Sequence, residues 1–257
     1  AWPYKTEKGV PTDFFYADLT GNCDLDNDGL IGEYPDDMGE GGFDLKSEIY
    51  VGRIPVYNND IDALDNILER IMKRDDSPKR MLLTLGIMNY NLENHLIWQR
   101  TDGSYLPSYL GKELGKEWTI TGLYEAEGLE PSNGLEHYTK ALNTKNFIEE
   151  WNKGYGLVFW LSHGNSESLF RKVWINDDGD GIPEDTEIEY IPYLNLSDIE
   201  DSLKPSQTFV FGLSCFSGMP ETPYNLQYFL LEHSALGVVG ATREAWYSYG
   251  TWMPSGE

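Results

Sequence analysis

Short apolar runs alternate along the chain with stretches in which apolar residues recur every three or four positions. The runs are rich in β-branched and aromatic residues, are too short for buried helices, and stop at Gly, Ser or Pro, which is typical of buried strands. This pattern predicts strands over residues 48–56, 81–88, 118–124, 157–161, 208–213 and 236–240. It assigns no element to the mixed region around Trp98 and Gly103.

Helical spacing of apolar residues predicts three helices between these strands. They are 60–73 with Asn59 as its N-cap, 144–154 with Thr144 as its cap, and a helix that opens at Thr222-Pro223. Strands that alternate with helices are typical of an open parallel sheet. Because the sequence holds no internal repeat and no low-complexity linker, we expect one α/β domain over residues 1–257.

The charge of the chain is strongly unbalanced, with 19 Lys and Arg against 43 Asp and Glu and a net charge of −24. Such a surface repels phosphate backbones and anionic membrane faces, so the composition argues against a nucleic-acid binder and favours metal ions or basic partners. No apolar run approaches the ~20 residues of a membrane span. Of the 43 carboxylates, 16 lie in segments 24–48 and 176–189, and this crowding indicates bound cations.

The segment 176–187 fills every position of a twelve-residue calcium loop. Gly181 stands at position 6, where the loop turns sharply, and the oxygen ligands fall at positions 1, 3, 5, 7, 9 and 12. These ligands are Asn176, Asp178, Asp180, the Ile182 carbonyl, Glu184 and Glu187. Pro183 disfavours a flanking pair of helices, so we expect an isolated structural loop rather than a sensor.

A second candidate calcium loop begins at Asp24 and continues with Asp26 and Asp28, followed by Gly29 at the turn position. Pro35 stands where the closing Glu would be. Glu33 is the expected closing ligand, with Asp36 and Asp37 as alternatives.

The candidate catalytic pair is His163 and Cys215, because each follows an apolar strand directly. The carboxyl ends of parallel strands form the crevice where ligands bind, so the two side chains are expected on one rim. An imidazole next to a thiol can take its proton and later return it to a leaving amine. Gly164 follows the histidine and offers a backbone N–H to a developing oxyanion.

The order of the pair narrows the class of enzyme. Papain-like peptidases place Cys before His, whereas here His163 precedes Cys215 by 52 residues, close to the spacing of about 50 in caspase-type enzymes. The caspase signature Gln-Ala-Cys-x-Gly is absent, since this chain reads Leu213-Ser214-Cys215-Phe216-Ser217-Gly218.

Five blocks in this order resemble the gingipain-type cysteine peptidases, relatives of caspases and legumains: PTDFFYADLTGNCDLDNDGLIGEY, EIYVGRIPV, WLSHGN, GLSCFSG and VVGAT. The resemblance implies a caspase-like three-layer α/β sandwich with a mostly parallel central sheet flanked by helices. It also implies structural Ca2+ at one or two sites, secretion or display at the cell surface, a polypeptide substrate, and a pro-segment or further domains in the same precursor. His163 and Cys215 fall on the family's catalytic residues, with Gly164 and Cys215 as oxyanion donors.

The same comparison leaves specific points open. The residues that give the best-known family members their preference for Arg or Lys have no match in this sequence, and the chain is expected to be incomplete at its N-terminus and perhaps at its C-terminus.

A catalytically inactive calcium-binding display or interaction module, with Cys23 and Cys215 joined as a disulfide, is the alternative to a calcium-stabilised cysteine endopeptidase. A hydrolase built on a carboxylate pair is a third reading, which predicts activity without Cys215.

Overall fold

The computed structural model describes residues 14–33, 35–44, 46–134 and 136–250. Two compact units form, residues 1–56 and residues 57–257, and each is described by itself. In the described part of the chain, no helix combines the length and apolarity that crossing a bilayer requires.

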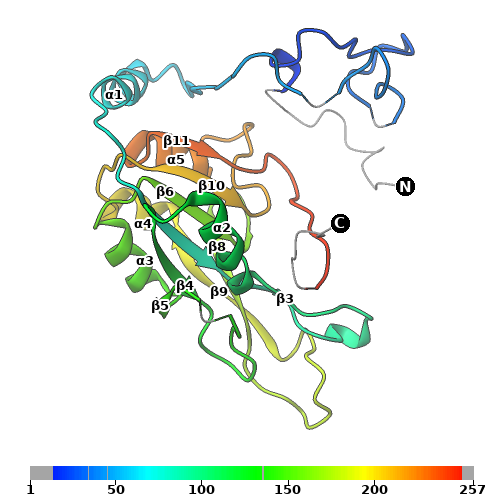
Figure 1. The fold of residues 1–257 in the computed structure, drawn as a ribbon, viewed down its shortest axis with the longest axis vertical. Coiled ribbons are helices and arrows are strands. Elements are labelled where there is room, and N and C mark those ends of the chain that lie inside the picture. Colours follow the sequence, from blue (N-terminus) through cyan, green and yellow to red (C-terminus); the bar gives the residue numbers. More distant parts are fainter. Residues whose placement is uncertain (1–13, 34, 45, 135, 251–257) are drawn as a thin grey trace. The chain divides into compact units, whose positions relative to one another are not determined.

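A six-stranded parallel sheet forms the centre of the second unit (Figure 1). Its strand order is β11-β10-β6-β1-β4-β5, so the chain crosses over the sheet between strands. The strands are β1 (Arg80–Leu85), β4 (Thr119–Tyr124), β5 (Tyr138–Ala141), β6 (Leu157–Leu161), β10 (Phe209–Leu213) and β11 (Gly237–Val239). This sheet confirms the predicted parallel α/β class and the predicted positions of five of its strands.

Helices cover both faces of the central sheet, because alternate strand residues are apolar on each side. One face packs Val158, Trp160 and their neighbours against α3, α4 and α5, and the other packs Leu83 and Phe159 against the side of α2. These helices span α2 (Pro107–Leu114), α3 (Thr144–Trp151), α4 (Leu196–Ser202) and α5 (Leu226–His233), while α1 (Ile61–Met72) packs on α5. The predicted three-layer arrangement is therefore present.

The helix caps differ from those predicted by one to three residues. Asp60 rather than Asn59 accepts the N–H of Ala63 at the start of α1, and Asn143 rather than Thr144 caps α3. Asn225 caps α5, so this helix begins after Thr222-Pro223. In each case a residue with a short oxygen-bearing side chain takes the cap, because only its side chain reaches the free N–H groups of the first turn.

Two smaller sheets stand beside the central one, and the sequence pattern did not predict them. A three-stranded antiparallel sheet contains β7 (His163–Gly164), β8 (Ser168–Trp174) and β9 (Ile188–Asn195), and a two-stranded ribbon pairs β2 (Ile87–Asn89) with β3 (Thr101–Asp102). The predicted strand 81–88 is split between β1 and β2 at Gly86. Strand β8 escapes a search for apolar runs because Arg171 and Lys172 lie in its middle and are buried there.

The predicted strand over 48–56 is wrong, because the structure has no strand in this segment of the first unit. Ile49, Tyr50 and Val51 are exposed side chains without a paired neighbouring strand among the described residues. High strand propensity gives a strand only where another strand supplies backbone partners and a face to bury. In the described residues the first unit holds a 3-10 turn, η2 (Phe14–Tyr16), and isolated bridges between loops.

We expect that replacing Trp160 by Phe destabilises the second unit by about 2 kcal/mol, measured by urea unfolding. Trp160 is fully buried, its indole N–H donates to Ser214 Oγ at 3.0 Å, and its ring covers Gly212. Val239→Ala, at a position that is 57% exposed, is the matched control and should change the free energy of unfolding by less than ~0.5 kcal/mol. Equal effects of the two substitutions would contradict this account.

Candidate active site

The pairing of β6 with β10 brings His163 and Cys215 together. In the parallel register Leu161 is opposite Leu213, and the next residue continues the pairing, since the Ser162 N–H donates to the Leu213 carbonyl at 3.1 Å. His163 and Cys215 each come two residues after this matched pair. Neighbouring strands are about 4.8 Å apart, so the two loops leave the sheet side by side.

The two loops touch at Gly164 and Ser214. A Cβ added to Gly164 would lie 2.9 Å from Ser214 Cβ, closer than real side-chain carbons approach. Both His163 and Cys215 line one pocket, which Met88, Trp246 and Tyr247 also line. Sequence reasoning therefore located two residues that the fold gathers at the same edge of the sheet.

A backbone carbonyl fixes the His163 ring. Nε2 lies 2.8 Å from the Met88 carbonyl oxygen of β2, and this acceptor requires the proton to be on Nε2. In the neutral ring Nδ1 then carries the lone pair and is the nitrogen that can accept a thiol proton. Tyr190 of β9 packs edge-on against the ring at a centroid distance of 5.1 Å.

Burial, with the positive charge of Lys172 acting in the same direction, lowers the pKa of His163 from 6.5 to about 4, while the hydrogen bond to Met88 opposes the shift. The imidazole is consequently neutral at physiological pH and can act as a base.

Cys215 stands at a sharp turn directly after β10. Its side chain is partly exposed, and Sγ is 4.0 Å from the Ala245 carbonyl oxygen. The next residue, Phe216, has φ +56°, a left-handed conformation that costs roughly 1–2 kcal/mol outside glycine. The Phe216 N–H donates to the Arg243 carbonyl at 2.9 Å, which holds the turn in place.

The acceptor for His163 is the residue that sequence reasoning missed. Every residue has a carbonyl, so Met88 carries no sequence signal for this role. The two carboxylates after β4 pair with Arg171, which donates to Glu125 at 3.0 Å and to Glu127 at 2.9 Å. Cys23, in the first unit, and Cys215, in the second, are both free thiols.

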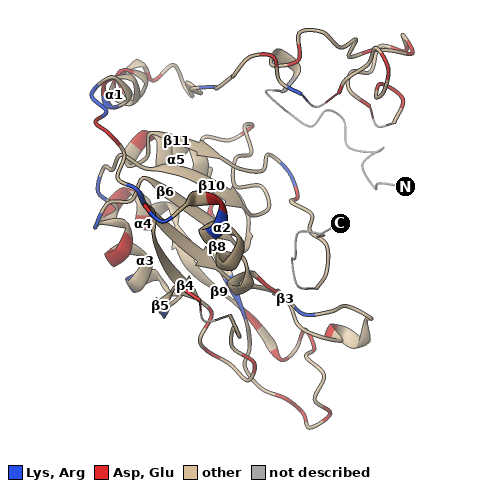
Figure 2. Ribbon diagram, viewed as in Figure 1, with Lys and Arg blue, Asp and Glu red and all other residues tan. Residues whose placement is uncertain are grey.

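The predicted calcium loop joins β8 to β9, so strands rather than helices flank it, as expected (Figure 2). Carboxylate oxygens of Asp178, Glu184 and Glu187 lie within 4.8 Å of one another. Glu187 is buried, and its oxygens accept the Asp178 N–H at 2.6 Å and the Trp174 indole N–H at 3.2 Å.

Gly181 and Asp180 of the same loop have a defined backbone conformation and a defined hydrogen bond, respectively. Gly181 has φ +73°, as its turn position requires, and Asp180 Oδ1 accepts the Ile182 N–H at 2.8 Å. The roles of the Asn176 side chain and the Ile182 carbonyl stay predictions.

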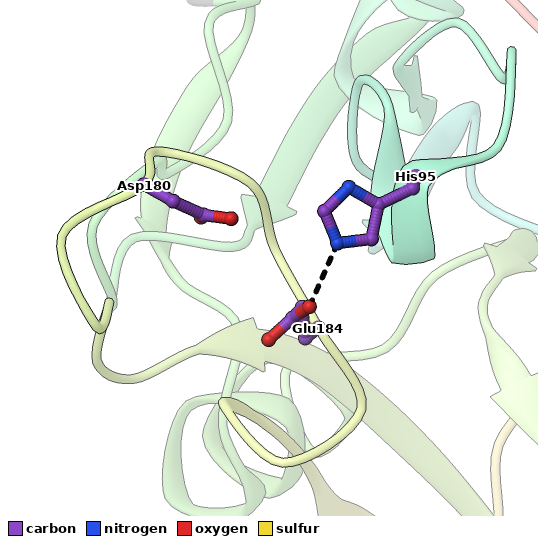
Figure 3. A group of neighbouring side chains, drawn as sticks. All are labelled: His95, Asp180 and Glu184. Carbon is purple, nitrogen blue, oxygen red and sulfur yellow. Dashed lines mark hydrogen bonds and ion pairs between the residues drawn. The ribbon is translucent and has the colours of Figure 1, made fainter.

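A histidine from another segment joins this loop. His95, the last residue of η3 (Glu93–His95), places Nε2 2.9 Å from Glu184 Oε1, and Asp180 extends toward the same ring (Figure 3). Sequence patterns did not single out His95, because the contact joins segments 89 residues apart.

In the first unit, carboxylate oxygens of Asp24, Asp26 and Asp28 lie within 4.8 Å of one another. Among the described residues, Glu33 is not part of this group. Asp37, one of the alternatives considered for closing the loop, is buried and accepts the Leu25 N–H at 2.6 Å and the Glu33 N–H at 2.9 Å.

The fold and site define an α/β protein that presents an imidazole and a thiol at the ends of adjacent parallel strands. The chain belongs to peptidase family C25, whose family model matches residues 2–256. No curated protein matches the sequence significantly.

Among solved structures, the Arg-specific cysteine proteinase gingipain R (RgpB) is similar with a TM-score of 0.54 and 13% identity over 90% of this chain. The complex of Porphyromonas gingivalis RgpB pro- and mature domains is similar with a TM-score of 0.51 and 13% identity over 79% of this chain. The match covers 47% of the gingipain R chain and 43% of the chain in the complex. This likeness shows the caspase-like fold that the sequence predicted.

We expect Gly164→Ala to lower the activity that depends on Cys215 by about 100-fold, because the added carbon would push the His163 and Cys215 loops apart. Gly111→Ala in α2 is the matched control, since its nearest contact would be an ordinary 3.6 Å and neither glycine has a left-handed φ. Steady-state kinetics on a peptide library, with melting temperatures alongside, measures the effect. Equal activity of the two variants would contradict the close approach of the loops.

Proposed function

We propose that this chain is a calcium-stabilised cysteine endopeptidase. The observation that carries the proposal is the shared position of His163 and Cys215, which follow matched residues of adjacent strands and line one pocket. Membership of family C25 supports the same class of reaction.

In the proposed reaction, His163 Nδ1 takes the proton of the Cys215 thiol, and the thiolate attacks the scissile carbonyl carbon. The backbone N–H groups of Gly164 and Cys215 stabilise the resulting oxyanion. The imidazolium, held through Nε2–H on the Met88 carbonyl, gives its proton to the leaving amine. Water then hydrolyses the thioester, with His163 again as the base, and restores the free thiol.

Two other readings make opposite predictions. An inactive display module with Cys23 and Cys215 joined as a disulfide predicts that neither sulfur reacts with a thiol reagent. A hydrolase that uses a carboxylate pair would keep its activity without Cys215.

We expect iodoacetamide to label Cys215 in the native protein and to abolish peptide cleavage, and Cys215→Ala to be inactive. Mass spectrometry of the adducts and cleavage of a peptide library measure both effects. Cys23→Ala is the matched control and should retain activity. Peptide cleavage by Cys215→Ala would refute the proposal and favour a carboxylate mechanism. Loss of activity only in Cys23→Ala would refute the assignment of Cys215 as the nucleophile.

We further propose that Ca2+ binds the β8–β9 loop and a second ion binds near Asp24, Asp26 and Asp28. Three carboxylates within 4.8 Å at each place repel one another unless a cation lies between them, and oxygen ligands suit Ca2+. In the β8–β9 loop, Asp178, Asp180, Glu184 and Glu187 would hold the ion, together with the Asn176 side chain and the Ile182 carbonyl. The role proposed for the ion is structural.

We expect EDTA to lower the melting temperature by several degrees, because an ion that binds only the folded chain at 100 times its Kd adds about 2.7 kcal/mol. Asp178→Asn and Glu187→Gln should each reduce this calcium-dependent difference. Asp65→Asn, an exposed position of α1, is the matched control. A wild-type melting curve that does not change on chelation would rule out both calcium sites.

The location and partners of the protein are proposed on the same basis. Calcium loops suit the calcium-rich extracellular space, so we propose a secreted or surface-displayed protein. The similar RgpB structure is a complex of pro- and mature domains, and by analogy we propose a pro-segment or further domains in the same precursor.

A further inference from the structure

One carbonyl oxygen gathers three donors beside the candidate active site. The Met88 carbonyl lies 2.8 Å from His163 Nε2, 3.2 Å from the Tyr247 hydroxyl and 3.5 Å from Lys172 Nζ. These donors come from three separate segments, so the position of this oxygen depends on all of them. Because it is the acceptor for His163, its position sets the orientation of the imidazole.

Lys172 also forms a buried ion pair with Glu93, and the two side chains are 3% and 4% exposed. The other Glu93 oxygen accepts the Tyr90 N–H at 2.9 Å, two residues after Met88. The Tyr90 hydroxyl donates in turn to the Lys172 carbonyl at 3.1 Å. The segment that carries Met88 is therefore tied to β8 through both partners of the ion pair.

A buried ion pair adds little stability compared with apolar residues of the same size, because both charges lose their water. The presence of this pair next to His163 is consequently better explained by what it does to the site than by folding energy. Lys172 Nζ lies 5.6 Å from the centre of the Tyr190 ring, and this ring also packs against the His163 ring.

The groups around the His163 ring include two neutral phenols as well as charged side chains. Burial raises the pKa of Tyr190 to about 12, with Glu93 and Asp185 adding to the shift, and burial also raises the pKa of Tyr247. Both phenols are therefore neutral. Among the described residues, the charges near the ring then come from Lys172, Glu93 and Asp185, and the Asp185 carboxylate also acts on Lys172. Lys172 carries the positive charge that opposes protonation of the imidazole.

We propose that Lys172, paired with Glu93, is a positioning residue for His163: it holds the Met88 carbonyl in place and keeps the imidazole neutral. This inference rests on the proposed peptidase function. Lys172 touches neither substrate nor the reacting sulfur in this scheme, and acts through the acceptor and through its charge.

The test is the pH profile of Lys172→Met. Removing the positive charge makes the protonated imidazole easier to form, so the pKa of His163 rises and the acid limb of kcat/KM moves upward by roughly one pH unit. We also expect kcat to fall by about tenfold at unchanged KM, because the imidazole is held less firmly. Lys172→Arg, which keeps the charge, should restore the wild-type limb.

Tyr90→Phe is the matched control, because it loses a bond between the same segment and β8 without removing a charge, and its acid limb should not move. If Lys172→Met does not fold, the double variant Lys172→Met with Glu93→Gln leaves no unpaired buried charge and should show an upward shift of the same sign. Two results would overturn the proposal. One is a folded Lys172→Met or double variant whose acid limb of kcat/KM stays at the wild-type pH. The other is an equal shift of the acid limb in Tyr90→Phe.

A second readout does not need activity. In Cys215→Ala protein, NMR titration of the His163 imidazole should show a midpoint near pH 4 that rises when Lys172 is replaced by Met. A rise without any peptidase activity in the parent protein would refute the proposed function and retain the electrostatic role of Lys172. Activity with an unmoved midpoint would refute the role of Lys172 alone.

Discussion

The site depends on the parallel register of three strands. Leu85 of β1, Leu161 of β6 and Leu213 of β10 lie opposite one another, and the residues just beyond them carry the Met88 carbonyl, His163 and Cys215. A slip by one residue would turn every side chain to the other face of the sheet and separate the imidazole from its acceptor. A Cβ on Gly212 would come within 2.3 Å of the Trp160 ring, so the fit of β6 against β10 has no room for another register.

Apolar runs predict these strands well, because a central parallel strand is buried on both faces and its sequence is apolar throughout. The runs ending before His163 and Cys215 became β6 and β10, and the three predicted helices start within a few residues of α1, α3 and α5. Segment 48–56 has the same composition but no partner strand, and propensity alone misled there. Met88 could not be predicted at all, since its function belongs to the backbone.

Strand β8 explains the largest gap between sequence and structure. Arg171 and Lys172 are consecutive, so they point to opposite faces, and both are buried. Arg171 reaches Glu125 and Glu127 after β4, while Lys172 reaches Glu93 after β2. Polar residues in such a strand hide it from a hydrophobic search, although each charge has a partner. Burying these ion pairs costs free energy of desolvation. In return, the pairs fix the positions of the loops that follow β4 and β2.

The acidic loop between β8 and β9 also contacts the segment from Met88 to His95, at the end of the segment away from Met88. The Asn94 side chain donates to Asp185 Oδ1 at 2.8 Å and accepts the Asp185 backbone N–H at 3.0 Å, and the Asn94 N–H donates to the Pro183 carbonyl. Leu92, Asn94 and His95 all have left-handed φ, a strained run that these contacts must hold. The segment from Met88 to His95 is thus held by hydrogen bonds to Lys172 of β8 and to the loop between β8 and β9. An ion in that loop would stiffen a segment whose first residue orients His163, so melting temperature and activity would change together. The charge of Lys172 adds an effect on the imidazole that stiffness does not produce, which is why only the pH dependence can separate the two.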